Sequence, residues 1–359
     1  MFSSPISITT SIALSLSSLR LAAAAPQDTL GNKDFPDPSI THDPQTGQWY
    51  TFATTGNGKN VQAAVIEGTP NSANTLHDNP NPWTYLEIDL LPNPGKWVNA
   101  TDPLIWAPDI HHIPSTDTFV MYYSGLKSDS PYHCIGVAIS PNITGPYVPI
   151  GDSPWACPED GGGAIDASVF SNTADSDVDD TLWVLYKIDG SAKGPGGPCG
   201  NGDPPGEPTP IVLQGVDPAD GITKLGDPIT ILDRLPEVDG PLIEAPNLIR
   251  AVDGTYVLFY SSHCYNTGDY DIKYATAKRI GGPYSRMGEV MGKGVGTFGF
   301  TSPGGATSVG DDLEVRKNEE DQSAVQGGTM VFHAECEAGR CMYMADFELG
   351  HGGVVRIVG

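Results

Sequence analysis

The sequence has few basic residues: 19 Lys and Arg are set against 44 Asp and Glu in 359 residues, which gives a formal net charge of −25. A polyanion such as a nucleic acid is repelled by this charge. No run after the N-terminal segment reaches the roughly 18 apolar residues of a membrane-spanning helix. No segment shows a convincing helical period of hydrophobic residues. These absences argue against a nucleic-acid partner, a membrane protein and a helical fold.

The first 25 residues contain no acidic residue, carry a stretch rich in Ser, Ile and Leu, and end in a run of alanines. This composition is typical of a secretory signal, although Arg20 is its only cation and the usual basic start is missing. We therefore predict a signal peptide over residues 1–24, a single domain over residues 25–359, and a secreted, extracellular, monomeric protein. Sequons at Asn99 and Asn142 fit a glycosylated extracellular chain.

Only six cysteines are present, and their spacing matches no metal site that we can identify. In a secreted chain they predict disulfide bonds. Cys336 and Cys341 flank a short EAGR turn and can pair across a hairpin. Three pairings remain open for the other four: Cys134, Cys157, Cys199 and Cys264.

Glycine and proline are abundant, with 43 and 32 residues, and they separate short aromatic and β-branched runs: QWYTFAT, DTFVMYYSG, TLWVLYKI, GTYVLFYSS and GTMVFHAE. Four of these runs follow a shorter run that opens at Asp37, Trp106, Asp166 or Glu244, and a weaker fifth copy opens at Ala306. The openings lie 69, 60, 78 and 62 residues apart. A second repeated element, GVAISPNITGPY and KYATAKRIGGPY, keeps the same phase. Such a long period predicts an all-β fold, a five-bladed β-propeller. A pair of β-sandwiches, the alternative, predicts the strands but not the shared phase.

The first strand of a propeller blade lies innermost, so the openings are expected to form a ring at the mouth of the central channel. The predicted ring consists of Asp37, Trp106, Asp166, Glu244 and Ala306. One carboxylate before a strand usually bonds the local backbone. Three that converge raise one another's pKa and are costly unless the site uses them.

Two chemistries draw carboxylates together in this way. A calcium site needs several more oxygen ligands than the neighbouring Pro, Ala and Trp residues supply. Glycoside hydrolysis needs one protonated acid and one ionised carboxylate, and a third carboxylate can tune the acid. The sequence therefore favours glycoside hydrolysis.

The ordered motifs DPSI, WAPDI, IDASVF, EAPNLI and YSSHCYNTGDYDIKYATA, followed by GPY, resemble glycoside hydrolase family 43, a family of five-bladed propeller glycosidases, over about residues 30–350. The resemblance implies that Asp37 is the general base, Glu244 the general acid and Asp166 the residue that tunes the acid. It also implies inversion at the anomeric carbon, for which the Asp37 and Glu244 carboxyls should lie roughly 6.5–9.5 Å apart.

The family resembled acts on arabinose- and xylose-containing plant material, so the implied partner is a neutral plant polysaccharide or oligosaccharide. The segment SSHCYNTGDYDIKYA favours an arabinanase or α-L-arabinofuranosidase. A β-xylosidase or xylan-acting member is the alternative, and a non-catalytic sugar-binding propeller is the alternative of another class. Trp106 can offer a sugar its indole face. The other candidate substrate-binding residues follow blade openings: His111, Tyr265, Asn266 and Tyr270.

Two departures from the family pattern concern the channel and the pocket. Many relatives carry a histidine near a channel ion in the fifth-blade opening, where this chain has Gly305 and Ala306. We expect no required cofactor; a structural calcium ion in the channel stays open, with His333 a weak candidate near it. No arginine of the chain lies in a motif that matches the family's pocket arginine. Asp109, three residues inside its strand, is expected to form a structural hydrogen bond.

Overall fold

The computed structural model describes residues 28–68, 70, 82–171, 181–194, 199–201, 206–293, 298–308, 314–317 and 324–358, so the predicted signal peptide lies outside the described residues. The strands form five antiparallel sheets, and in each sheet four strands follow one another in sequence order. Within the described residues, no helix is long and apolar enough to cross a membrane.

The first sheet contains β1 (Ser39–His42), β2 (Trp49–Ala53), β3 (Gln62–Ile66) and β4 (Thr84–Leu86). The second contains β5 (Trp106–Ile113), β6 (Thr118–Leu126), β7 (His133–Ser140) and β8 (Val148–Pro149). The third contains β9 (Ala164–Ser171), β10 (Leu182–Ile188), β11 (Ile211–Val216) and β12 (Lys224–Leu232).

The fourth sheet contains β13 (Ile243–Arg250), β14 (Tyr256–Ser262), β15 (Asp271–Ala277) and β16 (Ser285–Met291). The fifth contains β17 (Gly304–Ser308), β19 (Ala324–Cys336), β20 (Gly339–Gly350) and β21 (Val354–Ile357), and β18 (Glu314–Lys317) also pairs with β19. The short helical elements are η1 (Glu159–Gly161), η2 (Gly190–Lys193) and α2 (Pro236–Asp239).

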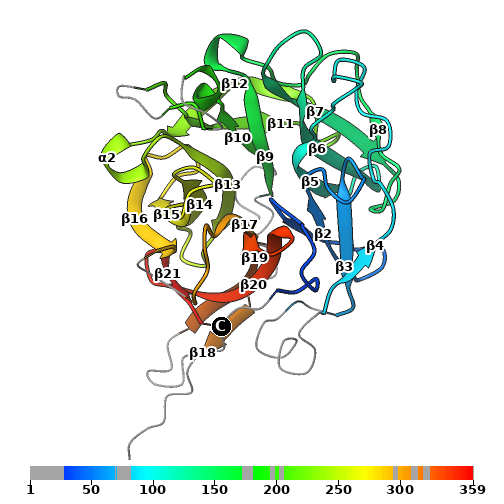
Figure 1. The fold of residues 1–359 in the computed structure, drawn as a ribbon. Helices are drawn as coiled ribbons and strands as arrows, with labels where there is room; N and C mark the ends of the chain where they lie inside the picture. Colours follow the sequence, from blue (N-terminus) through cyan, green and yellow to red (C-terminus); the bar gives the residue numbers. More distant parts are fainter. Residues whose placement is uncertain are drawn as a thin grey trace, which may run out of the picture.

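The innermost strands close into a ring. β1 contacts β5, β5 contacts β9, β9 contacts β13, β13 contacts β17, and β17 returns to β1. The sheets therefore stand around a common axis like the blades of a wheel (Figure 1). The predicted five-bladed β-propeller is confirmed.

Both faces of each sheet are covered by the neighbouring sheets. Along β14, Val257 and Phe259 pack against the fifth sheet, whereas Leu258 and Tyr260 pack against the third. Successive side chains of a strand point to opposite faces, so a blade covered on both faces needs apolar residues without a break. This need explains the continuous apolar runs in the sequence.

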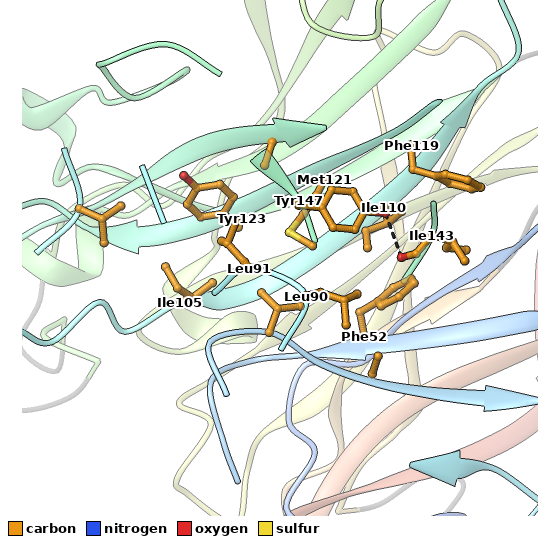
Figure 2. Close-up of a cluster of buried hydrophobic side chains, with 14 of the residues drawn as sticks. Phe52, Leu90, Leu91, Ile105, Ile110, Phe119, Met121, Tyr123, Ile143 and Tyr147 are labelled. Atoms are coloured by element: carbon orange, nitrogen blue, oxygen red, sulfur yellow. Dashed lines mark hydrogen bonds between the residues drawn. The ribbon is translucent and has the colours of Figure 1, made fainter. Parts of the chain in front are cut away.

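One such cluster, between the first and second sheets, is shown in Figure 2. Phe52 of β2 lies there with Phe119 and Met121 of β6, all fully buried. The hydroxyl of Tyr147 donates a hydrogen bond to the Ile143 carbonyl at 3.1 Å. Tyr284 makes the same bond to the Ile280 carbonyl at 3.0 Å. The second repeated element thus has the same local structure in both blades.

The N-terminal part of the described chain completes the fifth sheet. The Thr29 amide donates to the Met342 carbonyl at 3.1 Å, and the Phe35 amide donates to the Arg340 carbonyl at 2.8 Å. Phe35 is fully buried. The wheel is therefore closed by backbone hydrogen bonds between residues 28–35 and β20.

The cysteines form three disulfides. The predicted Cys336–Cys341 bond is present across the turn between β19 and β20. Of the pairings left open, the structure has Cys134–Cys157 and Cys199–Cys264. The second of these joins the loop after η2 to the loop after β14, and so ties the third blade to the fourth.

Every inner strand carries a β-bulge where it reaches the channel mouth. Two inner-strand residues face one residue of the second strand at residues 107–108, 166–167, 245–246 and 305–306. Residues 37–38, just before β1, are offset in the same way, because Ser39 pairs with Phe52 while the Thr54 amide donates to the Pro36 carbonyl. The first residue of each bulge has a left-handed backbone, with φ of 53° at Asp37, 41° at Ala107, 59° at Asp166, 50° at Ala245 and 60° at Gly305. A bulge adds a residue and re-aims the side chains beside it.

The bulges correct the predicted ring in three blades. Structurally equivalent residues are Asp37, Ala107, Asp166, Ala245 and Gly305. Trp106 and Glu244 precede their bulges by one residue, and Ala306 follows the first bulge residue and is buried in the core between the fourth and fifth sheets. The sequence runs do not open at equivalent positions: those at Trp106 and Glu244 open one residue before the bulge, and the run at Ala306 opens at its second residue.

We predict that Gly305→Ala destabilises the fold more than an ordinary left-handed glycine replacement does. An added Cβ at Gly305 would lie 2.8 Å from the His333 Nδ1 atom. The left-handed backbone costs about 1–2 kcal/mol, and the close contact adds about 1–3 kcal/mol. Gly47→Ala is the control, because Gly47 has a similar φ of +71° and nothing within 4 Å of an added Cβ. Urea unfolding measures both losses, and equal losses would contradict the contact.

Candidate active site

A cavity of about 320 Å³ lies at the bulges of the five inner strands, at one end of the central channel. Most of the predicted site residues line it: Asp37, Trp106, Asp166, Glu244, Tyr265 and Tyr270. The three carboxylates come from the first, third and fourth blades. The fold thus brings together residues that are far apart in the sequence.

Asp37 is held by a cation and a hydroxyl. Arg340 Nη1 donates to Asp37 Oδ1 at 3.0 Å, and Thr54 Oγ1 donates to Asp37 Oδ2 at 2.6 Å. Burial acts to raise the pKa of Asp37, but the Arg340 guanidinium and then the Thr54 hydroxyl act to lower it, and the pKa lies below its ordinary value. Asp37 is therefore ionised at neutral pH.

Asp166 and Glu244 form a second group across the cavity mouth. The Ala245 amide donates to Asp166 Oδ2 at 3.0 Å, so the Asp166 carboxyl is fixed against the residue that follows Glu244. Burial, and then the nearby Glu244 charge, raise the pKa of Asp166 well above its ordinary value, although Lys187 opposes them. Asp166 therefore keeps its proton to a higher pH than an ordinary aspartate does.

Two side chains donate to the Glu244 carboxylate. The Tyr270 hydroxyl donates to Oε1 at 2.8 Å, and Lys187 Nζ donates to Oε2 at 3.0 Å. Burial, and then the Glu244 charge, raise the pKa of Tyr270 well above its ordinary value. Tyr270 therefore stays protonated and acts as a hydrogen-bond donor.

Two aromatic residues line the cavity beside the carboxyls. Trp106 stacks on His133 with ring centroids 3.5 Å apart and an interplanar angle of 17°. Burial lowers the pKa of His133 to about 4, so the stack is uncharged at neutral pH. The Arg340 guanidinium lies over the Tyr265 ring at 5.0 Å from the centroid, and Tyr265 is 37% exposed. The cavity thus offers apolar ring surface next to the carboxyls, as a sugar site needs.

Two predicted substrate-binding residues do not line this cavity. His111 is the sixth residue of β5, five residues along the strand from Trp106, and at about 3.3 Å per residue this places it far down the channel. It lines a second cavity, of about 480 Å³, at the other end. The sequence predicted that His111, soon after a blade opening, lies near the mouth, but the WAPDIHHI run is one continuous inner strand that carries His111 away from it. Asn266 is an exposed residue of the loop beyond Tyr265.

His333 occupies a structural position under the first bulge. Its Nδ1 accepts the Asp37 amide at 3.0 Å, so the proton of the neutral ring is on Nε2. Nε2 is buried and has no hydrogen-bond partner among the described residues. A protonated ring nitrogen is a donor and fits a water or an anionic oxygen better than a cation. The described residues also contain no group of three or more His, Cys, Asp or Glu placed to hold a metal ion. These donors do not fit a channel calcium, and we assign no step to one.

Asp109 lies deeper in the channel and makes the predicted structural hydrogen bond. Its Oδ2 accepts the Val169 amide of the next blade at 2.7 Å. Burial raises the pKa of Asp109 to about 7. The contact joins β5 to β9 at the inner part of the cavity, which Asp109 also lines.

Three charged residues of the cavity lining were not found from the sequence: Lys187, Asp189 and Arg340. Arg340 lies at the start of β20, between Cys336 and Cys341 and outside any motif, and the pairing of that hairpin with residues 28–35 brings it to Asp37. Lys187 did leave a signal, because a lysine inside the apolar run TLWVLYKI must be buried. It is 1% exposed.

Comparison with known proteins agrees with this geometry. The model of the family "Glycosyl hydrolases family 43" matches residues 26–312, which is more than half of the chain. An extracellular endo-α-(1→5)-L-arabinanase of Bacillus subtilis is 27% identical over 79% of this chain and 58% of its own length. An arabinan endo-1,5-α-L-arabinosidase of Emericella nidulans is 33% identical over 30% of this chain and 29% of its own. The chain thus spans well under two thirds of these relatives.

Solved structures share the architecture. A thermostable family-43 glycoside hydrolase superposes with a TM-score of 0.70 at 20% identity, over 94% of this chain and 96% of its own. At this identity the likeness establishes the fold alone. The family itself is established by the match of the family model to residues 26–312. The chain belongs to glycosyl hydrolase family 43.

Proposed function

We propose that the protein is a secreted, inverting glycoside hydrolase that cleaves α-1,5-linked arabinan, with Asp37 as base, Glu244 as acid and Asp166 as the residue that tunes the acid. The observation that carries the proposal is the contrast between two carboxyl groups of one cavity. Asp37 is paired with Arg340 and ionised, whereas burial and the neighbouring Glu244 charge raise the pKa of Asp166 well above its ordinary value. Inversion needs one carboxyl in each state.

In the proposed reaction the Asp37 carboxylate removes a proton from water, and the water oxygen attacks the anomeric carbon. Glu244 gives its proton to the glycosidic oxygen as the bond to the departing sugar breaks. Asp166, which accepts the amide of the residue after Glu244, is the neighbouring carboxyl proposed to tune the acid. The carboxyl separation of roughly 6.5–9.5 Å that a single displacement requires stays a prediction. All proton transfers use side chains, so the proposed chemistry requires no cofactor.

The relatives support arabinan as the substrate. Both curated relatives are named for cleavage of 1,5-α-linked arabinan. The first is named extracellular, which supports secretion, as do the three disulfides. We accordingly propose a neutral plant polysaccharide as the partner of a monomeric, extracellular enzyme.

The substrate is tested by incubating the purified protein with debranched arabinan, arabinoxylan and aryl glycosides. We expect release of arabino-oligosaccharides or arabinose from arabinan, with the inverted anomer as the first product in proton NMR. Release from arabinoxylan alone would point to a xylan-acting enzyme. Binding of oligosaccharides without release of sugar from any substrate would point to a sugar-binding propeller and overturn the proposal.

The acid role predicts a leaving-group dependence for Glu244→Gln. The rate on arabinan should fall by about 10²–10⁴-fold, because the departing sugar needs a proton. The rate on an aryl arabinofuranoside with an acidic leaving group should fall much less. Asp37→Asn should lose both activities, and Glu237→Gln, an exposed carboxyl on α2, should keep both. Equal losses of Glu244→Gln on the two substrates would contradict the acid role.

The Arg340–Asp37 pair predicts a shift in the acidic limb of the pH profile. The base must be ionised, so kcat/KM falls as the pH drops through the pKa of Asp37. Arg340→Met removes the cation that lowers this pKa, and the acidic limb should move to higher pH by about 1–3 units. Arg356→Met, on an exposed arginine of the same blade, is the control. An unchanged limb in Arg340→Met would exclude Asp37 as the titrating base.

A further inference from the structure

The five blades cap their bulges in one way, with a single exception. In four blades, the amide of the first bulge residue donates to a side chain on the second strand of the preceding blade. The acceptors and distances are Thr54 Oγ1 for Ala107 (2.9 Å), Ser124 Oγ for Asp166 (3.2 Å), Ser261 Oγ for Gly305 (2.9 Å) and His333 Nδ1 for Asp37 (3.0 Å). All four occupy the same register position, opposite the residue before the bulge.

Lys187 occupies that position in the third blade, opposite Ile165. A lysine side chain has no acceptor, so it cannot cap the Ala245 amide as the other four residues cap theirs. Asp166 Oδ2 accepts that amide instead, at 3.0 Å. The third blade is thus the one whose second strand does not cap the bulge of the next blade, and that bulge directly follows Glu244.

The Lys187 ammonium group donates a hydrogen bond to Glu244, the proposed general acid. Its three donors are matched by Glu244 Oε2 at 3.0 Å, Asp189 Oδ1 at 2.9 Å and Ser191 Oγ at 3.0 Å. Burial acts to lower the pKa of Lys187, but the surrounding carboxylates raise it above its ordinary value, and the group stays charged. A buried ion pair is weak evidence for stability, so the departure from the common cap needs another explanation.

We propose that Lys187 is a positioning residue for Glu244, whose ammonium group fixes the carboxyl at the cavity and sets the pH at which that carboxyl loses its proton. The inference rests on the proposed function, since it gives Lys187 a part in proton delivery. Lys187 and Tyr270 hold one oxygen each, so the Glu244 carboxyl has a single orientation toward the cavity.

Other charged or titratable groups face this centre from the surrounding strands. They are Asp166 of β9, Asp189 after β10, Tyr270 before β15 and, further across the cavity, Asp37 before β1, with His133 of β7 next to Asp189. Within this set Lys187 is the cation that contacts Glu244. Its removal therefore stabilises the protonated form of Glu244 and moves the loss of the proton to higher pH.

The test follows the Glu244 carboxyl directly, by its side-chain carbon-13 resonance, assigned with Glu244→Gln. In Lys187→Met the titration midpoint should rise by about 1–3 pH units, and the alkaline limb of kcat/KM on arabinan should move with it. Lys187→Arg keeps a cation and should restore most of the wild-type midpoint. An unchanged midpoint in Lys187→Met would overturn the inference.

Lys273 provides a matched control. It is also a buried lysine paired with carboxylates, Asp239 and Asp271, but it does not line the cavity. Lys273→Met should lose stability in urea and keep the wild-type Glu244 midpoint; a shift equal to that of Lys187→Met would mark a general effect of lost charge and overturn the inference.

The experiment also distinguishes a Lys187→Met variant that does not fold from a failure of the proposed substrate. If Lys187→Met does not fold, Lys187→Met with Asp189→Asn removes both members of a buried pair and should show the same rise. If the wild type cleaves no arabinan while the Glu244 midpoint still rises in Lys187→Met, the proposed substrate fails and the link between Lys187 and Glu244 stands.

Discussion

The bulge at the mouth of each inner strand is the constraint on which the site depends. A regular strand turns alternate side chains away from the channel, so residues of one inner strand would reach the mouth only at every second position. The bulge breaks this alternation. Asp37 and Asp166 reach the cavity from the first bulge position, and Glu244 reaches it from the residue before. A left-handed backbone is the cost, and Asp and Gly tolerate it better than most residues.

Each bulge also leaves a backbone amide that needs a hydrogen-bond acceptor. In each case the acceptor is a side chain of the preceding blade, and two of these side chains lie at the carboxyl groups of the cavity. His333 caps the bulge of Asp37, and Asp166 caps the bulge next to Glu244. The backbone supports of the site are therefore themselves titratable groups. The two carboxyl environments differ because one contains Arg340 beside a single carboxylate, whereas the other contains Lys187 among several. The same bulge position therefore carries one carboxyl with a lowered pKa, Asp37, and one with a raised pKa, Asp166.

The sequence was sufficient for the fold and for the three carboxylates, because both leave local patterns: apolar runs, turn residues and short motifs that repeat in phase. The register at the mouth was wrong by one residue at Trp106, Glu244 and Ala306, because the five runs open at different positions relative to the bulge and the sequence does not mark where the bulge lies. His111 was placed at the wrong end of the channel because the length of its strand was not recognised. Arg340 could not be found, since its place depends on contacts between the two ends of the chain.

Those contacts affect when the ion pair can form during synthesis and folding of the chain. Arg340 and Asp37 are separated by 303 positions in the sequence, yet they form one ion pair, and β20 must pair with residues 28–35 before they can meet. In a nascent chain, Asp37 therefore has no guanidinium partner until residue 340 has been synthesised. The lowered pKa of Asp37 is thus a property of the closed wheel and not of the first blade alone.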